Sequence, residues 1–548
     1  YILWYTSSWS FLTEEIQSKL DNLTCWNDLK LGSSYSFILW DKPAAKYLIQ
    51  VDEFATCPLF FLESQGTYYI ADVFKELVDL FTLSLTINTA FVQDYLQPFS
   101  STRLVHNQTV YNEIERIVPQ HRLLISANEN VIIEHYLANW VPMSEIHHSD
   151  EIIQQVRAHF TASICRFTGT NNCVAANLSG GLDSSSIVSM LLSCKKNVHA
   201  LYAVIDGKEA DESFYIQAME YDFPALRIDK IPVQPATYSA VQNTTVVTGQ
   251  PDGMAAPSVL HAPLFEVVKA NTISLFFSGH GGDSIIGTSE FYSISIWEKL
   301  DFRALRRWRT SPHFRPSQYR LAWINAAVAW RKKGILFYLV KQVHCFLHAV
   351  LPATYLKSFI RLLLQVPNKK DLPVSHEIMR LQTPNGLTSE QKKHWESHFS
   401  LITVTANELL YTLGRAAGTK VIFPFQDFQL FEWALCFASE RNFAQGARRG
   451  LLREAMQDIL PEEIRQRTSK ATFTTYLTDS LRNVLQGFSE NKEMSVQQKL
   501  FISEKDWLAW QNTKNKVLQN KKVSMKQIDK CFKITYFLIW LEIFLPCS

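Results

Sequence analysis

The sequence lacks the features that would assign it to a disulfide-rich, zinc-binding or membrane-spanning class. Its nine cysteines are residues 25, 57, 165, 173, 194, 345, 436, 531 and 547. None forms a CxxC pair, so reduced thiols are expected instead of a disulfide framework or a zinc site. The first ten residues, YILWYTSSWS, have no basic start and no small-residue cleavage site, so no signal peptide is predicted there.

No apolar run is long enough to span a membrane. The most apolar stretch, Cys531 to Ser548, is interrupted by Lys533 and Glu542 and falls short of the roughly 20 apolar residues that cross a bilayer. We therefore expect a closing core helix here and a cytoplasmic location for the protein.

The chain is large enough for more than one domain. Its 548 residues and 63.0 kDa exceed a single hydrophobic core, and 47% hydrophobic residues can fill two or more. The net charge of +2 is unevenly distributed, because the segment from Asp301 to Lys370 holds fourteen lysines or arginines and one acid, Asp301. The remainder of the chain is therefore net negative.

The first 140 residues read as short strands with two helices. YSFILW, KYLIQV, PLFFLE and TYYIAD are typical of strands, VFKELVDLF and TAFVQDYL of helices, and RIVPQHRLLIS with NVIIEHYL of a closing strand pair. A polar stretch from Val141 to Glu151 then predicts a linker. His147 and His148 within it are interpreted as loop residues, because no further histidine or cysteine lies close to them in the sequence.

From Glu151 onward, strands and helices alternate. NNCVAANLS, VHALYAVID and ISLFFSG predict strands, and SSSIVSMLLSC and ESFYIQAMEYD predict helices, which is the order of a parallel α/β sheet. We therefore expect an α+β domain over residues 1–143 and an α/β domain over residues 150–548. Ligands of such sheets bind beyond the carboxyl ends of the strands.

Two glycine-rich turns follow two of these strands, NLSGGLDSSS from Asn177 and SGHGGDSIIG from Ser278. The first opens a helix, whose free N–H groups and dipole favour a phosphate. It has no GK[ST] sequence and so is not a Walker A loop, which suggests a pyrophosphate leaving group held by N–H groups, hydroxyls and metal. Asp183 and Asp283, one in each turn, are predicted to hold Mg²⁺.

SGGLDSS resembles the pyrophosphate loop of the asparagine synthetase family, and SGHGGDSIIG resembles its second signature, SGxGxDExxGG. Upstream, VDEFATCPLFF, IADVFKELVDLF and TVYNEIERIVPQHRLLIS are similar to motifs of that family's amidotransferase half. Downstream, PFQD, GLLREAMQDILPEEI and RQRTSKATF resemble its closing elements. The resemblance implies a degenerate Ntn-hydrolase, glutaminase-like sandwich followed by a PP-loop synthetase domain that adenylates a carboxylate with ATP.

The same resemblance implies roles for particular residues. Lys470 falls where a lysine stabilises the adenylate and the displacement transition state, as a fixed cation beside developing oxyanion charge would. Asp183 and Asp283 would carry Mg²⁺. The residues implied to contact ATP or pyrophosphate are Leu178, Ser179, Gly180, Gly181, Asp183, Ser184, Ser185, Val204, Ser278 and Gly279.

The chain departs from the family at two functional positions. Glutamine-dependent members begin with a cysteine nucleophile, whereas this sequence begins with Tyr1 and has Val51 in place of the arginine of the RD motif, so an inactive glutaminase fold is expected. In the SGxG signature, asparagine synthetases have Glu and β-lactam synthetases have Tyr, whereas this chain has His280. An imidazole is a suitable base for an amine, and Glu408 is the candidate carboxylate that orients it; a solvated helix residue is the alternative for Glu408.

A third departure is a basic, aromatic, helical insert at about residues 295–400. It is interpreted as a solvated face, with nucleic-acid binding, an interfacial membrane helix, a wall for a peptide substrate or a docking face as the alternatives. GHGGD, the lost cysteine nucleophile and the enlarged synthetase domain make the chain resemble the lasso peptide macrolactam synthetases. That branch implies a precursor peptide as substrate, a leader-binding protein and a leader peptidase as partners, and an isopeptide bond between an Asp or Glu side chain and the peptide's α-amine.

Two other functions stay open at this stage. One is a small-molecule amide ligase of the asparagine or β-lactam type. The other is a non-catalytic nucleotide-binding or nucleic-acid-binding protein on a synthetase fold. Nucleic acid is not an expected partner, and membrane association is not predicted.

Overall fold

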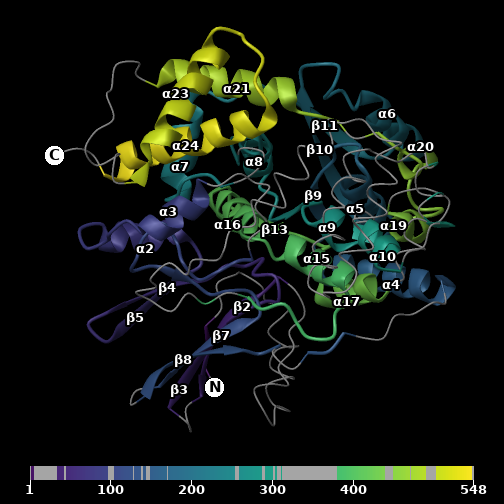
Figure 1. Ribbon diagram of the computed structural model, residues 1–548. Helices are drawn as coiled ribbons and strands as arrows, with labels where there is room; N and C mark the ends of the chain where they lie inside the picture. The colour runs from purple at the N-terminus through teal and green to yellow at the C-terminus, as the bar shows by residue number, and fades with distance from the viewer. Residues whose placement is uncertain are drawn as a thin grey trace, which may run out of the picture.

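A computed structural model gives the architecture of the chain (Figure 1). It describes residues 2–4, 34–41, 45–96, 104–126, 129–137, 140–142, 149–169, 171–253, 258–286, 291–299, 303–304, 306, 310, 379, 381–437, 449–469, 471–488 and 501–545. His147, His148 and Lys470 lie outside these residues.

The N-terminal unit is built from two antiparallel sheets. The five-stranded sheet has the order β1-β2-β3-β7-β8, and the three-stranded sheet has the order β5-β4-β6. The strands are β1 Ile2–Trp4, β2 Ser36–Asp41, β3 Lys46–Val51, β4 Phe60–Ser64, β5 Thr67–Ala71, β6 Glu115–Arg116, β7 His121–Ser126 and β8 Glu129–His135. Ile49 of β3 pairs with Leu123 of β7, and both join Phe61 of β4 in one buried cluster. The sequence prediction of an antiparallel sandwich is confirmed.

The second unit is a parallel sheet of five strands. Its order is β11-β10-β9-β12-β13, and every neighbouring pair is parallel. The strands are β9 Cys173–Asn177, β10 Asn197–Ile205, β11 Arg227–Val233, β12 Leu275–Phe277 and β13 Lys420–Ile422. Because the order reverses direction between β9 and β12, the carboxyl edge of these two neighbouring strands is a topological switch point, where open α/β sheets bind their ligands.

Helices cover both units (Figure 1). Those that precede the insert are α2 Phe74–Phe81, α3 Thr89–Tyr95, α4 Ser149–Thr168, α5 Leu182–Ser193, α6 Ser213–Asp222, α7 Tyr238–Thr248, η2 Ser258–Leu260, α8 Ala262–Ala270 and α9 Gly282–Ile285. The helices at the two ends of the insert are α10 Tyr292–Lys299 and α15 Ser389–His398. Those that follow it are α16 Leu401–Ala416, α17 Phe428–Cys436, α19 Gly450–Ala455, α20 Glu462–Arg465, α21 Thr474–Gly487, α23 Glu504–Leu518 and α24 Met525–Phe544. Helix α4 begins at Ser149, so the last residues of the predicted linker are helical.

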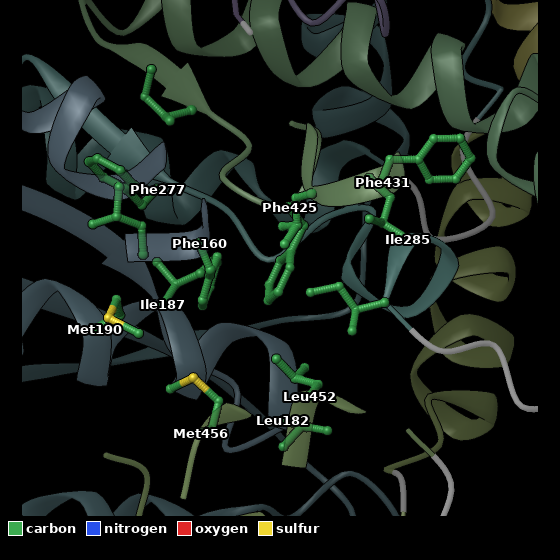
Figure 2. Close-up of a cluster of buried hydrophobic side chains, with 14 of the residues drawn as sticks. Phe160, Leu182, Ile187, Met190, Phe277, Ile285, Phe425, Phe431, Leu452 and Met456 are labelled. Atoms are coloured by element: carbon green, nitrogen blue, oxygen red, sulfur yellow. The ribbon is translucent and has the colours of Figure 1, made fainter. Parts of the chain in front are cut away.

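One hydrophobic core lies beneath the ends of the strands that carry the two glycine turns. Figure 2 shows Phe160 of α4, Ile187 of α5, Phe277 of β12 and Phe425 among its side chains, all of them buried. Phe160 and Phe425 stack with their ring centroids 4.7 Å apart. Burial at this level stabilises each side chain by about 1.5–3 kcal/mol, which fixes the helices and loops around the sheet edge.

A second core joins the N-terminal unit to the C-terminal helices. Helix α24 buries Trp540, whose ring lies 5.4 Å from that of Tyr111 in the N-terminal unit and whose Nε1 donates a hydrogen bond to the carbonyl of Gly249. The prediction of a closing core helix is therefore confirmed. Within the described residues, no helix is both long and apolar enough to cross a membrane.

Only the two ends of the predicted insert at about 295–400 are described. They contain helices α10 and α15, and α15 begins with a capping box formed by Thr388 and Gln391. His394 and His398 on α15 are buried instead of solvated. This end of the insert is therefore part of the core around the second glycine turn, which the sequence did not indicate.

Candidate active site

The two glycine turns touch each other at the switch point. Strand β12 pairs with β9, with Phe277 opposite Ala176, so the turns that follow leave the sheet side by side. A Cβ atom added to Gly282 would lie 2.3 Å from Oδ1 of Asp183, and one added to Gly279 would lie 3.0 Å from the backbone nitrogen of Ser184. Glycine is required at both positions because the backbone of the second turn packs directly on the first. Asp283 directly follows Gly282, and so the structure brings the two predicted metal ligands to one junction.

The first turn presents unsatisfied polar groups at the start of α5. Gly180 adopts a left-handed conformation with a φ of 67°, and Gly181 caps α5 with no side-chain hydrogen bond. Ser179 and Ser184 bond to each other, with the Ser179 nitrogen and the Ser184 Oγ 2.9 Å apart. The Oγ of Ser185 is buried and has no hydrogen-bond partner within the described residues. A helix start with free N–H groups and an unused hydroxyl is suited to an anion.

The other predicted nucleotide-binding residues lie along the same edge. Leu178 is fully buried and donates its N–H to the carbonyl of Leu201, and Val204 lies partly buried near the end of β10. Ser278 begins the second turn, and its Oγ accepts a hydrogen bond from the backbone N–H of His280. Their roles toward a nucleotide stay predictions, since the structure fixes only their positions.

Arg449 is a residue of this site that sequence reasoning missed. Its guanidinium contacts Asp183 at 2.5 and 2.7 Å and donates to the carbonyls of Gly282 and Ile286 at 2.7 and 3.1 Å. Arg449 itself has a left-handed backbone with a φ of 61°. The nearby charges of Asp183 and Asp283 raise its pKa against the opposing effect of its burial. It therefore clamps the two turns together with a permanent positive charge.

The donor set of the two turns fits a magnesium ion that is shared with phosphate oxygens. Mg²⁺ usually binds to proteins through one or two carboxylates together with substrate phosphates and water. Asp183 and Asp283 supply two carboxylates from adjacent turns. Within the described residues, no cluster of three or more His, Cys, Asp or Glu forms a closed metal site. An ion bound here would thus depend on phosphate for its remaining ligands.

A second arginine, Arg467, packs over the phosphate turn from the segment that follows α20. It donates to the carbonyl of Gly180 at 2.8 Å, pairs with Glu212 at 2.5 Å and lies 4.0 Å above the ring of Tyr215. The Oγ of Ser469 lies 3.1 Å from the hydroxyl of Tyr215. The sequence singled out this segment only for Lys470, which lies outside the described residues, whereas Arg467 is the residue seen at the turn.

His280 lies half-buried in the second turn, with its ring 6.0 Å from that of Phe423. Burial lowers the pKa of its imidazole, and the opposing charge of Asp283 is the smaller effect. Within the described residues, its buried Nε2 has no hydrogen-bond partner. A neutral imidazole with an unused ring nitrogen is equipped to accept a proton.

Glu408, the predicted partner of His280, is paired elsewhere in the structure. It is buried on α16, and its Oε1 lies 2.8 Å from Nε of Arg116 in the N-terminal unit. The exposed fractions of the two side chains are 2% and 1%. Burial raises the pKa of Glu408, and Arg116 opposes that shift. No contact between Glu408 and His280 is found among the described residues, and its catalytic role stays a prediction.

Two histidines of α15 also contact the second turn. Nδ1 of His398 lies 2.8 Å from the Oγ of Ser284, and Nε2 of His394 contacts the carbonyl of the same serine. Burial lowers the pKa of His394 to about 4. The imidazole that bonds to the carbonyl of Ser284 is therefore the neutral form. These histidines position the turn that carries Asp283.

Two family models match the chain. One is described as asparagine synthase and matches residues 155–516, and the other is described as a glutamine amidotransferase domain and matches residues 26–137. Among curated proteins, the glutamine-hydrolyzing asparagine synthetase 1 of Bacillus subtilis is 24% identical over 269 residues, which is 48% of this chain and 40% of the relative. Amidase chyE of Penicillium rubens is 23% identical over 282 residues, which is 46% of this chain and 39% of the relative. The matches thus span about two fifths of the length of these relatives.

Proposed function

The chain belongs to the asparagine synthase family, and we propose that it is an AMP-forming carbon–nitrogen ligase that activates a carboxylate with ATP and joins it to an amine. The phosphate turn and the two aspartates support the first half of this reaction. Ser179 to Ser185 offer N–H groups and hydroxyls to the departing pyrophosphate. Magnesium held by Asp183 and Asp283 would neutralise phosphate charge, and Arg449 adds a fixed cation beside them.

His280 carries the second half of the proposal. An amine attacks an acyl-adenylate only when it is unprotonated, so a base must lie next to the activated carboxylate. The free Nε2 of His280 lies in the turn that packs on the phosphate loop, and burial keeps the imidazole neutral. His280 would remove the proton from the attacking amine. The predicted role of Lys470 is to stabilise the adenylate and the oxyanion of the displacement step.

We propose further that the substrate is a peptide whose Asp or Glu side chain is joined to its own α-amine, as in lasso peptide macrolactam synthetases. The imidazole in the GHGGD signature and the long segment between Asp283 and Glu408 support this assignment. A folded peptide must be enclosed while its amine attacks, and a larger substrate chamber gives that orientation. A precursor peptide, a leader-binding protein and a leader peptidase are the proposed partners.

A small-molecule ligase of the asparagine or β-lactam type is the second candidate. The match of residues 26–137 to a glutamine amidotransferase domain and the similarity to a glutamine-hydrolyzing asparagine synthetase favour it. This candidate requires free amino acids as substrates in place of a peptide.

Product analysis with the purified chain separates the two candidates. It would be incubated with Mg-ATP and either free aspartate plus ammonia or a peptide encoded by a short reading frame beside the gene. AMP together with a peptide lighter by one water supports the cyclase. Asparagine formation with no change in the peptide supports the small-molecule ligase. If no AMP forms with either aspartate or the peptide, the ligase assignment is overturned.

Three variants test the assigned residues in the same assay. Asp183→Asn should lose pyrophosphate exchange, whereas Asp222→Asn, an exposed carboxylate at the end of α6, should retain it. His280→Ala should retain exchange but lose amide formation by about 10²–10⁴-fold, because only the amine step needs the base. Equal loss of both half-reactions in His280→Ala would contradict the role given to His280.

A further inference from the structure

Two cysteines meet on the surface where α4 and α5 lie side by side. Cys165 on α4 is exposed, and Cys194, which caps the carboxyl end of α5, is half-buried. Their sulfur atoms are 2.9 Å apart. The two thiols are therefore already in contact, with one of them open to solvent.

The packing of the two helices fixes this contact. One turn before the cysteines on each helix, the Oγ1 of Thr161 lies 3.3 Å from the sulfur of Met190. Since both pairs are separated by four residues on both helices, α4 and α5 run parallel and in register. Phe160 and Ile187 of the two helices are buried in the same core (Figure 2). The approach of the two sulfurs is thus consistent with the parallel register of the two helices.

The remaining described cysteines are differently placed. Cys57, Cys436 and Cys531 are buried. Cys173 is exposed at the start of β9, and no sulfur contact of Cys173 is found in the described part of the chain. Among the described cysteines, Cys165 and Cys194 are thus the two whose thiols are in contact at the surface.

We propose that Cys165 and Cys194 form a reversible disulfide, a redox modification site on the α4–α5 surface. Hydrogen peroxide would oxidise the exposed sulfur of Cys165 to a sulfenic acid with release of one water, and the thiol of Cys194 would then displace a second water from that sulfur to form the S–S bond. The balance is two thiols and one peroxide giving one disulfide and two waters. A dithiol reverses it by thiol–disulfide exchange. Disulfides of proteins that otherwise keep reduced thiols are usually of this transient kind.

The covalent ring closed by this bond would contain the whole phosphate turn. Between Cys165 and Cys194 the chain runs through β9, the turn from Leu178 to Gly181 and all of α5. The disulfide would hold the carboxyl end of α5 against α4 while its amino end carries the turn. This site is independent of the proposed function, because it rests only on the thiols and the packing of two helices.

Peptide mapping of the full chain tests the proposal. The protein would be oxidised with hydrogen peroxide, alkylated with N-ethylmaleimide and digested with trypsin without reduction. Cys165 lies in the peptide that ends at Arg166, whereas Cys173 and Cys194 share the peptide that ends at Lys195. The variant Cys173→Ser is therefore the matched control, since it removes the other exposed thiol from that peptide. We expect the cross-linked pair in the wild type and in Cys173→Ser, with loss after treatment with dithiothreitol.

The same mapping includes outcomes that overturn the proposal. Cys165→Ser and Cys194→Ala should each abolish the cross-link, and the two different replacements guard against a folding defect of one variant. A Cys173→Ser protein in which Cys165 and Cys194 are both alkylated after oxidation would overturn the assignment. So would a Cys165 found only as sulfinic or sulfonic acid, because the resolving thiol would then have failed to act.

Discussion

The buried ion pair between Arg116 and Glu408 makes Glu408→Gln a sharp test of how the two units are joined. The change keeps the shape of the side chain and removes its charge, which leaves the guanidinium of Arg116 buried at 1% exposure without a counter-charge. Removal of one partner of such a pair costs about 3–5 kcal/mol. Two unit charges roughly 4 Å apart at an effective dielectric constant near 20 attract by about 4 kcal/mol, which agrees with that range.

The double variant Arg116→Met with Glu408→Leu separates this structural role from catalysis. Replacement of both charges by apolar groups should recover stability to within about 1 kcal/mol of the wild type, because no uncompensated charge remains. The mutant cycle consists of the wild type, Arg116→Met, Glu408→Leu and the double variant. Urea unfolding of these four proteins, followed by tryptophan fluorescence, measures the coupling energy between Arg116 and Glu408. If Glu408 also orients His280, the stable double variant would still lose amide formation and keep pyrophosphate exchange. An unchanged unfolding midpoint for Glu408→Gln would refute the reasoning about the ion pair.

Two other variants probe the second glycine turn. Gly282→Ala places a Cβ 2.3 Å from Oδ1 of Asp183 and 2.9 Å from Phe425. The variant should therefore lose about 1–3 kcal/mol of stability and need a higher magnesium concentration for pyrophosphate exchange. An unchanged magnesium dependence would contradict the contact between the two turns. Burial lowers the pKa of His394 from 6.5 to about 4, so between these values the unfolded chain binds a proton that the folded chain does not, and stability falls as the pH drops from 6.5 to 4 by up to about 3 kcal/mol. Urea midpoints at several pH values should show a weaker acid dependence for His394→Gln than for the wild type, and equal slopes would refute this assignment.

Local patterns in the sequence predicted most of the strands, whereas helices such as α7 and α21 were not predicted. The alternation in KYLIQV and the apolar run in CVAAN became β3 and β9, because buried strands leave a direct signal in hydrophobic spacing. Strand β11 was not predicted, since Pro232 lies within it. The proline is tolerated because β11 is an edge strand, with a neighbour on one side only. Strand β13 was missed because it has three residues.

The site was predicted where its residues lie in short motifs and missed where they depend on long-range packing. Asp183 and Asp283 each follow a strand, and the rule that ligands bind at the carboxyl edge of a parallel sheet placed them together. Arg449 reaches Asp183 from 266 positions away, and nothing in the segment ARRGLL distinguishes it from a surface arginine. Arg116 and Glu408 are separated by 292 positions, so their pairing depends on how the two units dock.

The position of helix α24 has a consequence for the order in which the chain acquires its structure during synthesis. Trp540 completes a core that also contains Phe60 and Tyr111 from the N-terminal unit and Val241 from α7. Domains that emerge first from a ribosome usually fold first. Here the core shared by these segments stays open until residues near the carboxyl end have been translated. The nascent chain therefore exposes apolar surface for most of its synthesis, and a ribosome-bound chaperone that covers such surface should influence the yield of folded protein.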